Sequence, residues 1–141
     1  MDEKTREGDD CVRRCLTAIG YPAEEISAAL SSSSFTVDGL AMRVVGEPGG
    51  VRFEYPLGVA DDAALVRLGS LAAGRLARDA AVFAFGPVEG SAFIWQRVAR
   101  VDDDREIRRA FEGFAASAEW WHDRCGSASS GDDIPAMVIR P

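Results

Sequence analysis

The sequence predicts an α+β fold in which helices pack on an antiparallel, twisted sheet. Segments with helical spacing of apolar residues and segments with strand-like alternation follow one another in the order α-β-β-β-α-β-β-α. The strands are grouped and joined by short turns, which is typical of antiparallel pairs, whereas a parallel sheet needs a crossover helix between strands. With 141 residues, the chain is about one domain long. We expect residues 1–141 to form one domain, with flexible ends at residues 1–8 and 126–141.

The first helix is expected to begin at Asp9 or Asp10, because either side chain can cap it. Gly20 is expected to end it. Residues 23–30 can add one or two helical turns before the four serines 31–34 interrupt the pattern. The apolar residues on one face of the first helix are Val12, Cys15, Leu16 and Ile19.

The next part of the chain predicts three strands separated by turns. Apolar residues alternate on both sides of Asp38-Gly39, so residues 35–45 are expected to form a strand, a turn and a second strand. Residues 47–50, Glu-Pro-Gly-Gly, are a second turn signal. Residues 51–55 alternate apolar and charged side chains, which predicts a half-buried strand that ends at Pro56.

The second half of the chain predicts a helix, a hairpin and a final helix. Asp61 and Asp62 stand at the start of the middle helix, where their negative charge is favourable. Residues 80–85 and 92–98 form the hairpin, and the aspartates 102–104 begin the final helix. The apolar residues of that helix recur at steps of four and three, at Ile107, Phe111, Phe114, Ala118, Trp121 and Cys125.

Composition and charge exclude several function classes. The chain has 23 acidic and 16 basic residues, a net charge of −7 and a pI near 4.7. This balance argues against nucleic acid as a partner and against a basic surface for membranes. No segment approaches the ~18 apolar residues of a membrane span, and the charged residues 1–10 lack the apolar part of a signal peptide. We therefore expect a cytoplasmic protein without nucleic-acid or membrane partners.

Three cysteines and one histidine are the candidates for thiol or metal chemistry. Cys11 and Cys15 stand one helical turn apart, and His122 and Cys125 stand at i and i+3. Together they could form a zinc site, or His122 and Cys125 a nucleophilic pair. However, each residue falls in the apolar register of its helix, and no Gly-rich oxyanion loop accompanies them. We favour packing roles, with no metal, cofactor or catalysis, and keep a small thiol- or zinc-dependent enzyme as the alternative.

Several fragments stand in the order seen in one family of bacterial proteins. They are Ile19-Gly20-Tyr21-Pro22, Phe35-Thr-Val-Asp-Gly39, Phe53-Glu-Tyr-Pro-Leu-Gly58, the hairpin 80–98 and Trp120-Trp121. In this respect residues 11–125 resemble the class I type III secretion chaperones of Gram-negative bacteria, which are small, acidic cytoplasmic proteins that bind a secreted effector. The middle helix departs from the family pattern, because it lacks the Leu-Leu pair and the terminal Asn often seen there.

The resemblance implies a non-catalytic protein that binds the N-terminal segment of an effector and keeps it soluble and secretion-competent. Binding would combine β-strand addition with burial of apolar side chains in grooves. The groove residues are expected on the first helix and the early strands, at Val12, Leu16, Ile19, Phe35, Val37, Met42, Val44, Phe53 and Tyr55.

The resemblance also implies a homodimer joined through the middle helix, residues 62–78, and the strand of residues 80–85. Small residues on that helix would let two backbones approach. Trp120 lies outside the apolar stripe of the final helix and is a further interface candidate. The expected dimer-interface residues are Leu68, Gly69, Ala72, Ala73, Leu76, Phe83 and Phe85.

Overall fold

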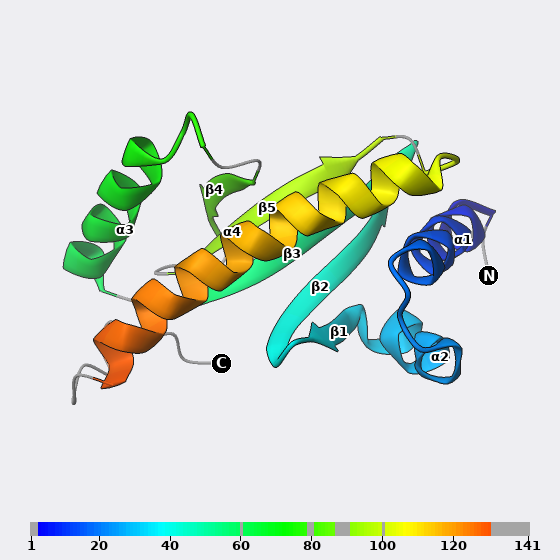
Figure 1. Ribbon diagram of the computed structural model, residues 1–141, viewed down its shortest axis with the longest axis horizontal. Coiled ribbons are helices and arrows are strands. Elements are labelled where there is room, and N and C mark those ends of the chain that lie inside the picture. The colour runs from blue at the N-terminus through cyan, green and yellow to red at the C-terminus, as the bar shows by residue number, and fades with distance from the viewer. Residues whose placement is uncertain (1–2, 60, 79–80, 87–90, 100, 131–141) are drawn as a thin grey trace.

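The computed structural model describes residues 3–59, 61–78, 81–86, 91–99 and 101–130 (Figure 1). Its elements are α1 (Glu3–Ala18), α2 (Ala23–Ser32), β1 (Ser34–Val37), β2 (Leu40–Glu47), β3 (Gly50–Val59), α3 (Asp62–Gly74), β4 (Val82–Phe85), β5 (Ser91–Val98) and α4 (Asp104–Ser130). The strands form one antiparallel sheet in the order β1-β2-β3-β5-β4. The predicted α+β class and element order are confirmed.

The hydrophobic core lies between one face of the sheet and the helices α1 and α4. In Figure 1, α4 runs along β3 and β5, and α1 lies toward the end of α4 where that helix begins. Phe53 of β3 is completely buried at the centre of the core, and its ring centroid lies 5.2 Å from that of Phe111 and 5.8 Å from that of Phe114. The stripe predicted for the final helix is therefore the helical side of the core, with Ile107, Phe111, Phe114, Ala118 and Trp121 all buried.

The first helix begins earlier than expected, which corrects its predicted start. Because α1 runs from Glu3 through Asp9 and Asp10, neither aspartate is its N-cap. Close packing against β2 accompanies the additional turns: a Cβ atom on Gly46 would lie 2.8 Å from the Cα atom of Gly8. Only glycine at position 46 permits that approach. A contact between segments so far apart in the chain leaves no local sequence signal.

The third strand continues past Pro56, so its predicted end there is wrong. The ladder between β2 and β3 stops at the pair Arg43–Glu54, and continuing it would place Ala41 opposite Pro56. Proline has no N–H to donate to β2, so the two strands separate at this point, as Figure 1 shows. On its other side β3 stays paired with β5, with an irregularity between Pro56 and Gly58.

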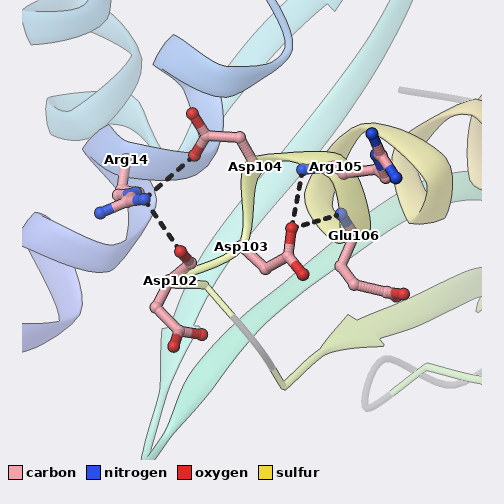
Figure 2. A network of polar contacts seen from close by, with 6 residues as sticks. All are labelled: Arg14, Asp102, Asp103, Asp104, Arg105 and Glu106. Carbon is pink, nitrogen blue, oxygen red and sulfur yellow. Dashed lines mark hydrogen bonds and ion pairs between the residues drawn. The ribbon is translucent and has the colours of Figure 1, made fainter.

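Polar contacts define where the helices α3 and α4 begin. The side chain of Asp61 accepts a 2.8 Å hydrogen bond from the N–H of Ala64, which caps α3 as the sequence predicts. Asp103 caps α4 by accepting from the N–H groups of Arg105 and Glu106 (Figure 2). α3 ends at Gly74, short of the predicted residue 78. α4 continues to Ser130 and so includes the first five residues of the end 126–141 that the sequence analysis expects to be flexible; residues 131–141 lie outside the described residues.

Figure 2 also shows how α1 is joined to the start of α4. The Nη2 atom of Arg14 lies 3.1 Å from the main-chain oxygen of Asp102 and 3.1 Å from Oδ1 of Asp104. Both side chains of the ion pair are about half exposed, so water screens it and its contribution to stability is below about 1 kcal/mol. The contact orients α1 more than it stabilises the fold.

Candidate functional site

Most of the residues predicted to bind an effector belong to the core of the chain. Ile19 and Val37 are half-buried and accessible at the surface. The other members of the set are buried between the sheet and the helices, and they are Val12, Leu16, Phe35, Met42, Val44, Phe53 and Tyr55. α1 and α4 cover these seven side chains, which are therefore part of the core, while Ile19 and Val37 remain accessible.

The two accessible members lie in a corner formed by α1, α2 and β1. We call Ile19, Tyr21, Leu30 and Val37 the N-terminal corner, because all four are apolar or aromatic, half-buried and packed against the core. The ring of Tyr21 meets that of Phe35 edge-on, with 5.7 Å between centroids. The corner adjoins β1, which is one of the two edges of the sheet.

The backbone of β1 offers hydrogen-bonding groups at that edge. The N–H of Val44 donates to the carbonyl of Ser33, and bonding alternates along an antiparallel pair. The backbone groups of Ser34 and Thr36 therefore point away from β2. An extended segment could bond to them there and place apolar side chains beside the N-terminal corner.

Exposed hydrophobic side chains are concentrated on α3, on the residues that follow it and on β4. Among the residues whose side chains are described, every large hydrophobic side chain that is clearly exposed falls between positions 66 and 85. These side chains keep between 40% and 80% of their surface in solvent, and we call them the α3–β4 patch: Val66, Leu71, Leu76, Val82 and Phe85. A contiguous apolar patch is typical of an interaction surface, so these residues are candidates for one.

The residues predicted for a dimer interface divide between this patch and the core. Leu68 is buried, because the stripe Ala64, Leu68 and Ala72 faces the rest of the chain. Phe83 is half-buried, and its ring stacks on Trp121 with 5.6 Å between centroids. Gly69 and Ala72 are half-buried, whereas Ala73, Leu76 and Phe85 are exposed. Sequence reasoning missed Val66, which lies outside the apolar stripe of its helix, and Val82 at the start of β4.

Trp120 packs on neighbouring residues rather than standing free. Its ring lies under the guanidinium carbon of Arg75, 3.8 Å from the ring centroid, and the guanidinium of Arg124 lies 4.8 Å from the same centroid. The adjacent Trp121 meets it edge-on at 5.1 Å. These contacts attach Arg75, at the end of α3, to α4.

The proposed thiol and zinc chemistry depends on residues at two ends of the molecule. Cys15 lies near Asp104, the first residue of α4, and Cys11 lies one helical turn before it on α1. His122 lies about 27 Å further along α4 at ~1.5 Å per residue. Nδ1 of His122 is 2.9 Å from the hydroxyl oxygen of Tyr55. The side chain of Cys125 is outside the described residues. In the part of the chain that the structure describes, no three potential metal ligands come together.

Neither described cysteine is activated as a nucleophile. Burial raises the pKa of the Cys15 thiol to about 12, and Cys11 adds to the effect. Burial also raises the pKa of Cys11, and the carboxylates of Glu7 and Asp10 raise it further. Because the thiolate is the reactive form, both groups are weak nucleophiles near neutral pH.

Paired charges occupy part of the sheet face opposite the core. Glu54 is almost completely buried there, with its carboxylate 2.8 Å from Nε of Arg52 and 3.6 Å from Nη1 of Arg43. Glu47 lies 3.4 Å from both Arg52 and Arg97. Because each of these arginines has a carboxylate neighbour, this side of the sheet is not a free basic surface for an anion.

Comparison with known proteins establishes the fold. No protein-family model and no curated protein matches the sequence. A chain of the HopA1–SchA chaperone–effector complex is 14% identical and has a TM-score of 0.50, with 64% of this chain and 73% of that chain covered. A chain of the ExoT–SpcS complex from Pseudomonas aeruginosa is 18% identical with a TM-score of 0.51, over 84% of this chain and 98% of that chain.

The chain has a class I type III secretion chaperone-like fold. This confirms the resemblance at the level of the fold. None of the described helices is long and apolar enough to cross a membrane.

Proposed function

We propose that this chain is a cytoplasmic type III secretion chaperone that binds the N-terminal segment of an effector and keeps it soluble and secretion-competent. The observation that carries the proposal is the likeness of its fold to chains from the HopA1–SchA chaperone–effector complex and the ExoT–SpcS complex. The raised thiol pKa values and the separation of the cysteines from His122 favour a binding protein over a thiol- or zinc-dependent enzyme.

The effector segment is proposed to bind at the β1 edge and the N-terminal corner. Its backbone would pair with Ser34 and Thr36, and its apolar side chains would cover Ile19 and Val37. Burial of apolar surface yields ~25 cal/mol per Å², and ordering of the segment offsets part of that gain. This mechanism needs neither a nucleotide nor a metal.

The test is binding of the N-terminal segment of a secreted protein encoded beside this chain, measured by calorimetry. Ile19→Asp and Val37→Asp should weaken binding by about tenfold or more, because each places a charge against apolar surface. Thr17→Asp is the matched control, because Thr17 is an exposed residue of α1 close to Ile19 in the sequence but is not part of the N-terminal corner. Circular dichroism checks that each variant is folded. Unchanged affinity in both corner variants would overturn this location, and absence of any binding would overturn the chaperone function.

A homodimer is proposed to form through the α3–β4 patch. The support is the exposure of Val66, Leu76 and Phe85, which leaves an apolar surface that a second copy could cover. Light scattering at micromolar concentration should give about twice the 15.1 kDa of one chain. Val66→Lys should lower that mass, whereas Thr36→Lys on the opposite edge should not. A wild-type mass near 15.1 kDa would contradict the dimer.

A further inference from the structure

Two arginines stack on Trp120 where the end of α3 meets α4. The guanidinium carbon of Arg75 lies 3.8 Å from the centroid of the indole ring, and that of Arg124 lies 4.8 Å from it. Arg78 is exposed in the turn that follows Arg75, and Asp123 is an acidic neighbour of Arg124 on α4. The junction therefore has an excess of positive charge on a chain whose net charge is −7.

Exposed leucines adjoin these arginines. Leu71 stands one helical turn before the C-cap residue Arg75, on the same flank of α3, and is 40% exposed. Leu76 directly follows Arg75 and is 80% exposed. At ~100° per residue, Val66 lies about 140° around the helix from Leu71, so it belongs to another face of α3. Together the arginines and leucines suit an occupant in which carboxylates are followed by apolar side chains.

The chain contains such a segment directly after α4. Residues 132–139 read Asp-Asp-Ile-Pro-Ala-Met-Val-Ile, so two carboxylates come first and apolar residues follow them. This segment lies outside the described residues. Its order matches the order of the surface, because Arg124 lies near the end of α4 and the leucines lie further away, beside Arg75.

The length of the segment is sufficient for it to reach this surface. At ~1.5 Å per residue, Arg124 lies ~9 Å and Trp120 ~15 Å before Ser130 along α4. An extended chain advances ~3.3 Å per residue, so Asp133 can reach ~10 Å and Met137 ~23 Å from Ser130. The acidic pair can therefore return to the arginines, and the apolar residues can continue to the leucines.

We infer that residues 132–139 fold back onto this junction of their own chain, with the two carboxylates beside the arginines and the apolar side chains over Leu71 and Leu76. A segment joined by a short linker has a millimolar effective concentration at its site. A separate acidic partner lacks that advantage and is repelled by the net charge of −7. Effector binding plays no part in this contact, and Val66 stays available for the proposed homodimer.

Proteolysis of the whole chain measures whether the segment is covered. Thermolysin cleaves before large apolar residues, and its rate at residues 134–139 reports the fraction of chains in which the segment is released. Leu76→Asp should raise that rate about tenfold or more, because a charge replaces apolar contact area. Ser70→Asp is the matched control, because Ser70 is exposed on α3 about 140° around the helix from Arg75. Mass spectrometry locates the cuts, at a protein concentration below that of dimer dissociation.

An exchange of charges tests the contact between the carboxylates and the arginines. Arg124→Glu should also raise the cleavage rate about tenfold, because it places two acidic groups against a third. Adding Asp132→Arg and Asp133→Arg to this variant should restore the slow rate. Arg108→Glu is the matched control, since Arg108 is exposed near the start of α4. Circular dichroism checks the fold of each variant.

Three results would contradict the inference. Equal cleavage rates in the wild-type, Leu76→Asp and Arg124→Glu chains would mean that the segment does not cover the junction. Slow cleavage only at concentrations at which two copies associate would mean that the segment binds the second copy. If the wild-type segment is cleaved as fast as a synthetic peptide of residues 131–141, and an effector segment slows hydrogen exchange near Leu76, the surface belongs to the effector.

Discussion

Phe114→Ala is the sharpest test of the core between α4 and the sheet. Phe114 has no exposed side-chain surface, and its ring stacks on that of Phe53. A buried aromatic side chain removes about 150–250 Å² from water, which at ~25 cal/mol per Å² corresponds to about 4–6 kcal/mol. Alanine keeps the Cβ part, so we expect the free energy of unfolding to fall by about 3–5 kcal/mol. That is a large share of the ~5–15 kcal/mol typical of a folded domain.

Guanidinium denaturation followed by circular dichroism measures this loss. Protein concentration must be the same for every variant, because association of two copies shifts the midpoint. Glu112→Ala is the matched control, because Glu112 is exposed on the same helix and its replacement should change the free energy by less than about 0.5 kcal/mol. An unchanged midpoint for Phe114→Ala would show that this face of α4 meets solvent or a partner, and the packing argument would fail.

Three further predictions follow from burial. Trp121→Phe should cost much less than Trp121→Ala, because the buried indole N–H has no hydrogen-bond partner to lose; parallel denaturation curves measure the difference. Val44→Asp should unfold the chain rather than weaken binding alone, since Val44 is buried and the charge would be unpaired; circular dichroism measures this. Iodoacetamide should alkylate Cys11 before Cys15 in the folded chain. Folding raises the pKa of the Cys15 thiol from 9.0 to about 12. The contribution of this thiol to the free energy of unfolding is therefore fully present below pH 9 and is lost as the pH rises toward 12.

The sequence predicts the elements with a long, regular period best. The stripe of α4 identifies five buried residues because a helical face repeats over many turns, and each turn adds independent support. The ends of α1 and β3 depend instead on contacts between distant segments. Gly46 determines how closely α1 approaches β2, and β5 supports β3 beyond Pro56. Local residue patterns carry no information about such neighbours.

The candidate site could be predicted only in part, for a related reason. Alternation indicates which face of a strand a side chain lies on, but not whether another element covers that face. Val44 and Phe53 are therefore indistinguishable in the sequence from residues of an open groove, although both are buried under the helices. Val66 and Phe85 are exposed because no described part of the chain covers them, and their own positions in the sequence do not indicate this.

Gly69 offers a test in which stability and association should change in opposite directions. It lies inside α3, and a Cβ atom there would meet nothing within 4 Å in the chain. Gly69→Ala should therefore raise the free energy of unfolding of the separate chain by about 0.5–1 kcal/mol, because alanine loses less backbone entropy in a helix. Ser70→Ala is the matched control, because it favours the helix without adding bulk at an exposed position.

In the dimer the same methyl group should be unfavourable. If a second copy approaches α3 closely at Gly69, the added atom separates the two backbones, and sedimentation should show weaker association than for Ser70→Ala. Stability is measured at a protein concentration below dimer dissociation, so that the two effects remain separate. Greater stability with unchanged association would mean that Gly69 lies outside the interface. The contact between copies would then depend on the large apolar side chains of the α3–β4 patch and not on close approach of the helices.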